Sequence, residues 1–217
     1  DPIITKILRT KKYKQKIIQI DTSKIPTLFE RITNKYFLSF GNRENLIFVL
    51  KICQILKLKK EKILKTINKF KGLKYRQQIV FNNNNLTIIN DSKSTSLASS
   101  ENLLKNLKSV YWIICGIPKK GDKFNLTKSQ CKNFKSYIFS NYYKQFNKNF
   151  KNKLITKKFN NLKHTLNQIF LEIKNNKRKK HTILFSPAGA SFDNFKNFEE
   201  RGFYFNQTIK KYLNAKR

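Results

Sequence analysis

The 217-residue chain contains no methionine, only three cysteines and only two histidines. Cys53, Cys115 and Cys131 are odd in number, widely spaced and without a paired-cysteine motif. The sequence therefore predicts neither a disulfide framework nor a zinc site, and we expect no metal ligands in this chain. Because 217 residues without methionine are unusual, we also expect the chain to be a fragment whose beginning is missing.

Long apolar runs are absent as well. No run approaches the roughly 18 residues that a membrane-spanning helix needs, and the first residues, DPIITKILRT, lack the pattern of a signal peptide. Hydrophobic residues nevertheless make up 39% of the chain, which is enough for one good core or two modest ones. These features predict a globular protein of the cytoplasm.

Acidic residues are scarce, with 12 Asp and Glu against 47 Lys and Arg, which gives a formal net charge of +35. Such an excess is typical of proteins that bind the phosphate backbone of nucleic acids. Lysine supplies 40 of the 47 basic residues, however, and they are spread along the whole chain as on solvated helix faces. The abundance of Asn, Ile, Phe and Tyr favours an AT-rich coding bias as the cause. Nucleic-acid binding stays open as the alternative.

The character of the sequence changes near Gly72. Before it, the stretches 42–58 and 60–70 repeat apolar residues at helical spacing, which predicts two packed amphipathic helices. The boundary separates a first part, residues 1–71, from a second, residues 72–217. The apolar positions of the two helices are Leu46, Val49, Leu50, Cys53 and Leu56, followed by Ile63, Leu64, Ile67 and Phe70.

After Gly72, predicted strands alternate with predicted helices, which is typical of an α/β fold. The run VYWIIC is apolar on both faces, as in an interior strand of a mostly parallel sheet. The last helix is expected to open with a capping box of Asn197 and Glu200. The strands are expected at 78–81, 86–90, 110–115, 136–140 and 181–186, with a short one at 154–155; a helix over 159–176 has Phe159, Leu162, Leu166, Ile169, Phe170 and Ile173 on one face.

Three polar stretches follow predicted strands: NDSKST (90–95), GIPKKGDKF (116–124) and SPAGASFDNFKNF (186–198). Ligands of open α/β sheets bind outside the carboxyl ends of the strands. If these strands are neighbours, their loops form one rim, where two lysines and helix N-terminal amides would attract an anion. The rim would hold Asp91, Lys93, Thr95, Lys120 and Ser191.

Simpler interpretations exist for each residue taken alone. Asp91 or a neighbouring serine could cap a helix, and Lys120 could be one solvated lysine among many. Ser191 and Asp193 do not form a convincing hydrolase site, because the nucleophile-elbow pattern is absent and no histidine lies nearby in sequence.

Taken together and in this order, the three strings resemble the C-terminal domain of the Mur ligases, specifically of those that add D-glutamate to UDP-N-acetylmuramoyl-L-alanine. SPAGASFDNFKNFEERG is the most diagnostic string. Upstream, GLKYRQQ is similar to the start of that domain, and GNREN is similar to an N-x-x-N motif of the central ATP-binding domain. The resemblance covers about residues 35–213. It implies a Rossmann-like C-terminal domain with a mostly parallel sheet, preceded by the tail of a central α/β ATPase domain.

The resemblance also implies roles for nine residues. The family reaction uses ATP and Mg²⁺ to phosphorylate a carboxylate, and the amine of D-glutamate then attacks the acyl phosphate. By resemblance, the chain would act as a monomer in peptidoglycan synthesis, without a specific nucleic-acid partner. Asn42 and Asn45 would border the adenine, Arg76 and Asp91 would contact the phosphates or ribose, Lys93 would be the catalytic residue near the acyl phosphate, and Thr95, Lys120, Ser191 and Phe198 would form the D-glutamate pocket.

The sequence departs from the family pattern in three places. Gly41 stands where the family has a histidine before N-x-x-N, and Ile117 replaces a glycine. No G-x-x-x-x-G-K-[ST] phosphate loop occurs in the chain. We therefore expect the UDP-sugar domain, the carbamylated lysine and the Mg²⁺ ligands to lie upstream of Asp1, and we do not expect the chain alone to catalyse. Another amino-acid ligase of the same superfamily is the main alternative.

Overall fold

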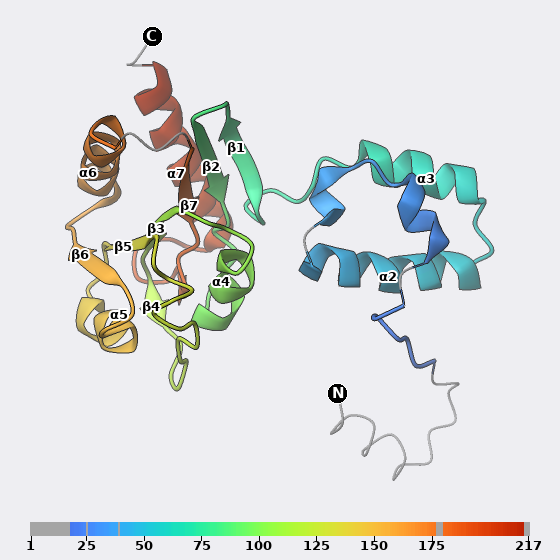
Figure 1. Cartoon of the computed structure of the whole chain (residues 1–217), viewed down its shortest axis with the longest axis horizontal. Helices are drawn as coiled ribbons and strands as arrows, with labels where there is room; N and C mark the ends of the chain where they lie inside the picture. The colour runs from blue at the N-terminus through green and yellow to red at the C-terminus, as the bar shows by residue number, and fades with distance from the viewer. Residues whose placement is uncertain (1–17, 25, 39, 177–179, 215–217) are drawn as a thin grey trace. The chain divides into compact units, whose positions relative to one another are not determined.

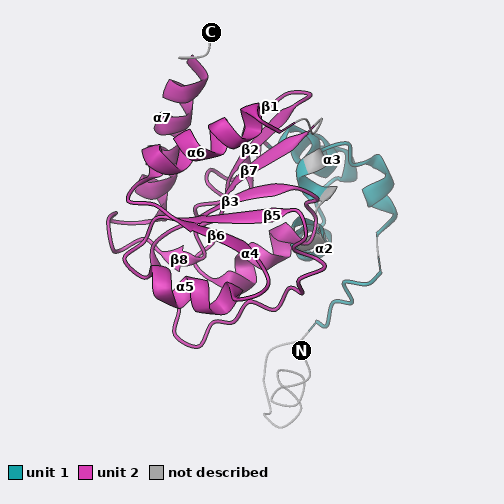
Figure 2. Cartoon of the chain, turned by 60° about the vertical axis from the view of Figure 1, so that its left-hand side comes forward, with its two compact units in different colours: residues 1–70 teal, residues 71–217 magenta. Residues whose placement is uncertain are grey.

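A computed structural model of the protein describes residues 18–24, 26–38, 40–176 and 180–214 (Figure 1). The chain divides into two compact units, Asp1–Phe70 and Lys71–Arg217, which Figure 2 shows in different colours. This division lies one residue before the boundary expected between residues 71 and 72. Within the described residues, no helix is both long and apolar enough to cross a membrane.

The first unit is helical, and both helices that the apolar spacing predicts are present. The side-chain amide of Asn34 donates to the carbonyls of Ile67 and Phe70 at 2.8 and 2.7 Å, which satisfies backbone acceptors at the end of the second helix. The elements are η1 (Thr27–Arg31), η2 (Lys35–Leu38), α2 (Phe40–Ile55) and α3 (Lys60–Lys69), and the core consists of Ile32, Leu46, Leu50, Leu64 and Ile67.

The prediction of which α2 residues face the core is partly wrong. Val49 and Leu56 were expected to face the core but are exposed, whereas Ile47 is buried. The reason is that α2 carries large apolar residues around most of its circumference, so helical spacing alone cannot tell which side packs. Phe70, which follows α3, is also partly exposed.

The second unit contains a six-stranded sheet with the order β1-β2-β7-β3-β5-β6. Only β1 is antiparallel to its neighbour, so the expected α/β fold with a mostly parallel sheet is confirmed. The strand expected at 136–140 begins two residues earlier, because Phe134 is already buried and paired with Val110. The strands are β1 (Gln78–Asn82), β2 (Leu86–Asn90), β3 (Val110–Ile114), β5 (Phe134–Ile138), β6 (Ile155–Lys158) and β7 (His181–Phe185).

Helices cover both faces of this sheet (Figure 1). All five residues of β3 are buried, as expected for an interior strand. Trp112 packs with residues of α4 and α5 on one face, and Tyr111 and Ile113 pack with residues of α6 and α7 on the other. The helices are α4 (Leu97–Leu104), α5 (Tyr143–Phe150), α6 (Leu162–Lys174) and α7 (Phe198–Asn214).

The starts of α6 and α7 are capped by asparagines. The apolar face predicted for α6 is confirmed, and Asn161 accepts a hydrogen bond from the His164 amide before it. Asn197 accepts from the Glu200 amide at 2.8 Å, as predicted. The second half of the expected capping box is wrong, because the Glu200 carboxylate accepts from the amide of Lys196 instead.

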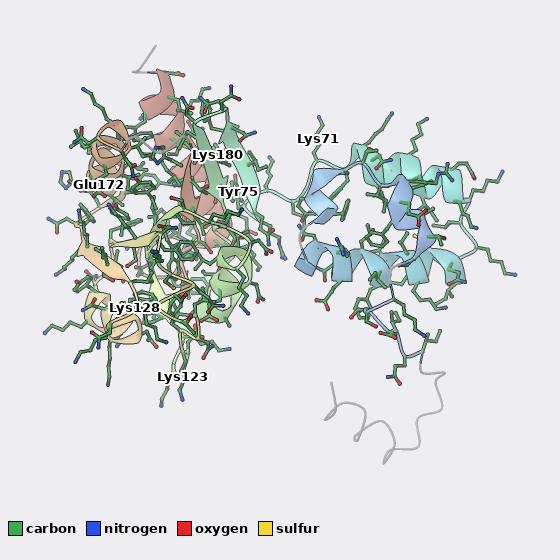
Figure 3. All side chains as sticks on the ribbon, viewed as in Figure 1. Lys71, Tyr75, Lys123, Lys128, Glu172 and Lys180 are labelled. Carbon is green, nitrogen blue, oxygen red and sulfur yellow. The ribbon has the colours of Figure 1, made fainter. Side chains whose placement is uncertain are left out.

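Glu172 on α6 connects the helix to the strands β5 and β6 (Figure 3). Burial alone would raise the pKa of this carboxyl group, but four hydrogen bonds lower it from 4.5 to about 2. The donors are the ammonium groups of Lys135 and Lys157, both at 2.7 Å, the hydroxyl of Tyr137 at 2.8 Å and the amide of Gln168 at 3.0 Å.

A carboxyl group whose pKa is lower in the folded state stabilises the protein above its unfolded pKa, and this contribution is lost as the pH falls toward 2. We expect Glu172→Gln to lower the free energy of unfolding by about 1–2 kcal/mol at pH 7, discounted because both lysines are partly exposed. The difference should vanish near pH 2. Urea unfolding at several pH values measures it, with exposed Glu199→Gln as the control. Equal stability of the two variants at pH 7 would contradict the prediction.

Candidate active site at the carboxyl ends of β2, β7 and β3

The three strands that precede the polar loops are neighbours in the sheet, in the order β2-β7-β3, which meets the condition on which the expected rim depends. The backbone amide of Asp91 donates to the carbonyl of Phe185 at 2.7 Å, and the amide of Cys115 donates to that of Pro187 at 3.2 Å. Two short strands, β4 (Ile117–Pro118) and β8 (Gly189–Ala190), pair antiparallel and join the second loop to the third. The three loops therefore meet at one edge of the sheet.

The carboxylate of Asp91 is buried at this edge, and both of its oxygens accept hydrogen bonds from other residues of the chain. Its Oδ1 accepts from the Gln77 amide at 3.1 Å, and its Oδ2 accepts from the Ser186 hydroxyl at 3.0 Å. Burial raises the pKa of the carboxyl group to about 6, although both hydrogen bonds and the charge of Arg76 act in the opposite direction. The cap of the following helix is Ser96 rather than Asp91. Helix capping therefore does not explain Asp91.

Because the pKa of Asp91 is higher in the folded than in the unfolded state, its charge costs stability increasingly as the pH rises from 3.8 through 6. Asp91→Asn removes this titration while keeping the size of the side chain. We expect the variant to gain about 2 kcal/mol of unfolding free energy relative to the parent between pH 4 and pH 8. Urea unfolding at the two pH values measures this gain. If the unfolding free energies of the two proteins change with pH in the same way, the pH dependence does not come from Asp91.

Lys93 contacts the third loop. Its side chain is half-buried, and its ammonium group lies 4.1 Å from the centre of the Phe198 ring at the start of α7. A cation over an aromatic face is attracted electrostatically and loses some mobility. The carbonyl of Phe198 also accepts from the Ser92 hydroxyl at 2.8 Å. The structure thus brings together two predicted site residues that are more than one hundred positions apart in sequence.

The other predicted residues of the second unit differ in exposure. Arg76, Thr95 and Lys120 are exposed, whereas Ser191 is buried immediately after β8. The Lys120 loop and Ser191 extend from the same β4–β8 pair, and Lys123 marks the loop in Figure 3. Ile117, which replaces a glycine of the family pattern, is part of β4 and pairs with Ala190.

The two asparagines expected near the adenine belong to the first unit. Asn42 is half-buried, and its side-chain amide donates to the Tyr36 carbonyl at 2.9 Å. Asn45 is exposed one turn further along α2, and Gly41 lies in the same helix.

Arg201 on α7 is a central residue of this edge that sequence reasoning missed. The side chain is completely buried and links the first loop to the third. Nε donates to the Ser92 hydroxyl at 3.1 Å and Nη2 to the Ser92 carbonyl at 2.8 Å, while Nη1 donates to the Gly189 carbonyl at 2.8 Å. Burial lowers the pKa of the guanidinium group. Among 47 basic residues, only its place in the FEERG string could have singled it out.

Tyr75 ties the start of the second unit to the same edge (Figure 3). Tyr75 and Gln77 have positive φ angles of 60° and 49°, which are costly for residues other than glycine. The Tyr75 carbonyl accepts from the Lys93 amide at 3.0 Å. Its ring lies so close to Gly202 that a Cβ there would come within 2.5 Å of it. Gly202 is thus needed for the close approach of α7.

The chemistry of this edge suits an organic anion. Lys93, Lys120 and Arg76 supply cations, and the carboxylate of Asp91 is already hydrogen-bonded by the chain. In the part of the chain that the structure describes, no three His, Cys, Asp or Glu residues are grouped as metal ligands. Cationic side chains of this kind suit an anionic ligand such as a phosphate or a dicarboxylate.

No family model matches the chain. Curated relatives do match, and the three described next all carry the name UDP-N-acetylmuramoylalanine–D-glutamate ligase. The one from Wolbachia sp. subsp. Brugia malayi is 35% identical over 162 residues, covering 75% of this chain and 32% of the relative. The one from Rickettsia prowazekii is 31% identical over 82% of this chain and 40% of the relative, and that from Prochlorococcus marinus 35% identical over 79% and 37%. The chain thus spans about a third to two fifths of the length of these relatives.

Two solved structures share the fold. The crystal structure of UDP-N-acetylmuramate–alanine ligase MurC from Thermotoga maritima aligns with a TM-score of 0.56 at 17% identity, covering 82% of this chain and 39% of that one. MurF ligase from the same organism, in complex with ADP, aligns with a TM-score of 0.50 at 12% identity over 79% and 39%. At these identities the similarity establishes the fold alone.

Proposed function

We propose that this chain, which is homologous to the D-glutamate-adding Mur ligases, supplies the amino-acid-binding part of such a ligase and the adjoining part of its ATP-binding domain. The reaction would join D-glutamate to UDP-N-acetylmuramoyl-L-alanine in peptidoglycan synthesis. The observation that carries the proposal is the contact of Lys93 with Phe198, because it joins two family strings at the carboxyl edge of the sheet.

The residues of this edge suit the two halves of that reaction. D-glutamate carries two carboxylates, which Lys120 and backbone donors near Ser191 and Phe198 would hold. Lys93 would lie near the acyl phosphate and offset the negative charge that develops as the amine attacks. Thr95, at the end of the first loop, would complete the pocket.

The nucleotide contacts belong to the same proposal. Asn42 and Asn45 would border the adenine, and Arg76 and Asp91 would contact the phosphates or the ribose. ATP supplies the phosphoryl group that activates the acceptor carboxylate. Its Mg²⁺ would be held by residues outside this chain. By the same proposal, the protein acts as a monomer in the cytoplasm and contributes to cell shape and cell division.

The chain itself allows a direct binding test. We expect D-glutamate, at millimolar concentration, to shift the backbone amide NMR signals of residues 93–95, 117, 119–121 and 189–198 more than L-glutamate does. Lys120→Ala, at an exposed position, should weaken this response roughly tenfold without unfolding the chain. Lys128→Ala, also exposed, is the control. Equal responses to both enantiomers, or shifts elsewhere in the chain, would count against the assignment.

Turnover requires a phosphate loop, which the sequence lacks. We therefore define a chimera in which this chain replaces the matching segment of the Rickettsia prowazekii relative. If the chimera releases phosphate with another amino acid in preference to D-glutamate, the chain belongs to a sister ligase of the superfamily instead.

A further inference from the structure

Lys120 lies in a tight turn of the second loop. The backbone amide of Asp122 donates to the Lys119 carbonyl at 3.2 Å, which closes the turn over residues 119–122. Gly121, the third residue of the turn, has a φ angle of +76°, as the third residue of a type II turn does. Lys120 is therefore the second residue, and its side chain is exposed. The placement of this turn decides which ligands the ammonium group can reach.

The end of the turn is bonded to helix α4. The Asp122 carboxylate accepts from the amide of Leu97, the first residue of that helix, at 2.5 Å. This amide is one of those that a helix leaves without an internal acceptor, and negative charge near a helix N-terminus is favourable. Ser96, the N-cap, already accepts from the amide of Ser99. Asp122 thus supplies a second acceptor to α4, and it comes from the loop that carries Lys120.

Helix α4 in turn accepts a bond from the same loop. Glu101 of α4 is only 4% exposed, and its Oε1 accepts from the backbone amide of Asn125 at 2.5 Å. Between these two bonds, Phe124 is buried in the core, and its carbonyl accepts from the Lys153 ammonium group at 2.6 Å. Two carboxylates, one from the loop and one from the helix, therefore hold residues 122–125 against α4.

The beginning of the turn is held by the third loop. Pro118, which directly precedes the turn, pairs with Gly189 between β4 and β8, two residues before Ser191. The backbone on both sides of Lys120 is thus fixed, by β8 on one side and by α4 on the other. Because a lysine side chain is long and flexible, the backbone beneath it determines how well the ammonium group meets a bound carboxylate.

We propose that Asp122 and Glu101 are positioning residues for Lys120, which hold its turn where the ammonium group binds a carboxylate of D-glutamate. The inference rests on the proposed function, which places Lys120 in the D-glutamate pocket but assigns no role to either acid. Negative charge two residues from Lys120 opposes the binding of a dicarboxylate. The bond to the Leu97 amide gives a reason for an acid at this position, and Asp122 acts on the substrate only through the turn.

The test compares loss of each carboxylate with its conservative replacement. In the chimera, Asp122→Ala and Glu101→Ala should each raise the KM for D-glutamate about three- to tenfold and leave kcat within about twofold, because the lysine binds substrate and transition state alike. Asp122→Asn and Glu101→Gln should restore most of the loss, because an amide oxygen can still accept the backbone bond. Asn161→Ala removes the cap of α6 and is the matched control, with a similar loss of stability but an unchanged KM.

A second measurement uses this chain alone and needs no substrate. Backbone NMR relaxation should show that Lys120 and Gly121 are more mobile in Asp122→Ala than in the parent, in Asp122→Asn or in the control. Unchanged mobility and KM in both alanine variants would overturn the inference, and so would a KM that rises equally in Asn161→Ala. If the mobility rises as expected but the parent chimera does not use D-glutamate, the proposed function fails, although the carboxylates still hold the turn.

Discussion

Lys93→Ala is expected to lower the ligase rate of the chimera roughly 10²- to 10³-fold, the usual loss when a preorganised group that stabilises developing charge is removed. The physical reason is position: the first loop and the Phe198 ring hold the ammonium group at the edge where three loops meet. Phosphate release with D-glutamate and UDP-N-acetylmuramoyl-L-alanine measures the rate.

Stability should change little, because the Lys93 side chain is only half-buried and the residue bonds to the Tyr75 carbonyl through its main-chain amide, which alanine keeps. Lys123→Ala, in the exposed loop after β4, is the matched control and should keep the parental rate (Figure 3). A rate for Lys93→Ala within about threefold of the parent would remove this lysine from the catalytic site.

Arg201→Met is expected to destabilise the protein by about 3–5 kcal/mol, the largest effect on stability that we predict. The substitution keeps much of the buried volume but leaves two carbonyls and a hydroxyl, from Ser92 and Gly189, without their donor. Arg201→Lys should recover only part of the loss, because an ammonium group cannot reproduce the planar fork of the guanidinium group. Urea unfolding measures both variants.

The control for Arg201 is Lys211→Met, an exposed basic residue of the same helix. We also expect Arg201→Lys, which should still fold, to change the NMR signals of Lys93 and Ser191, because the first and third loops lose their common anchor. If Arg201→Met is as stable as the control, the guanidinium group does not hold the loops together.

The interior of the fold was predictable because buried parallel strands read as continuous apolar runs. VYWIIC identified β3 in this way, and the alternation of strands and helices predicted a polar loop after each of three strands. That these strands are neighbours, so that the loops meet, is shown only by the sheet order. The start of β5 was missed because Lys135 interrupts its apolar run. The two-residue strands β4 and β8 are too short to leave any periodic signal.

The local environments of the site residues were much less predictable. Sequence spacing cannot show that Asp91 is buried with both oxygens hydrogen-bonded, or that Thr95 and Lys120 are exposed. Arg201 could not be identified in so basic a sequence, because the sequence does not distinguish a buried arginine from a solvated one. Tertiary burial decides all of these cases, and Asp91 and Arg201 each bond to a residue more than 90 positions away.

The amino-acid dependence of the chimera tests the central claim most directly. With ATP, Mg²⁺ and UDP-N-acetylmuramoyl-L-alanine present, we expect phosphate release to require D-glutamate and to stay at background with L-glutamate, glycine or L-alanine. Phosphate release that is independent of D-glutamate, or that prefers another amino acid, would contradict the assignment of this chain to a D-glutamate ligase.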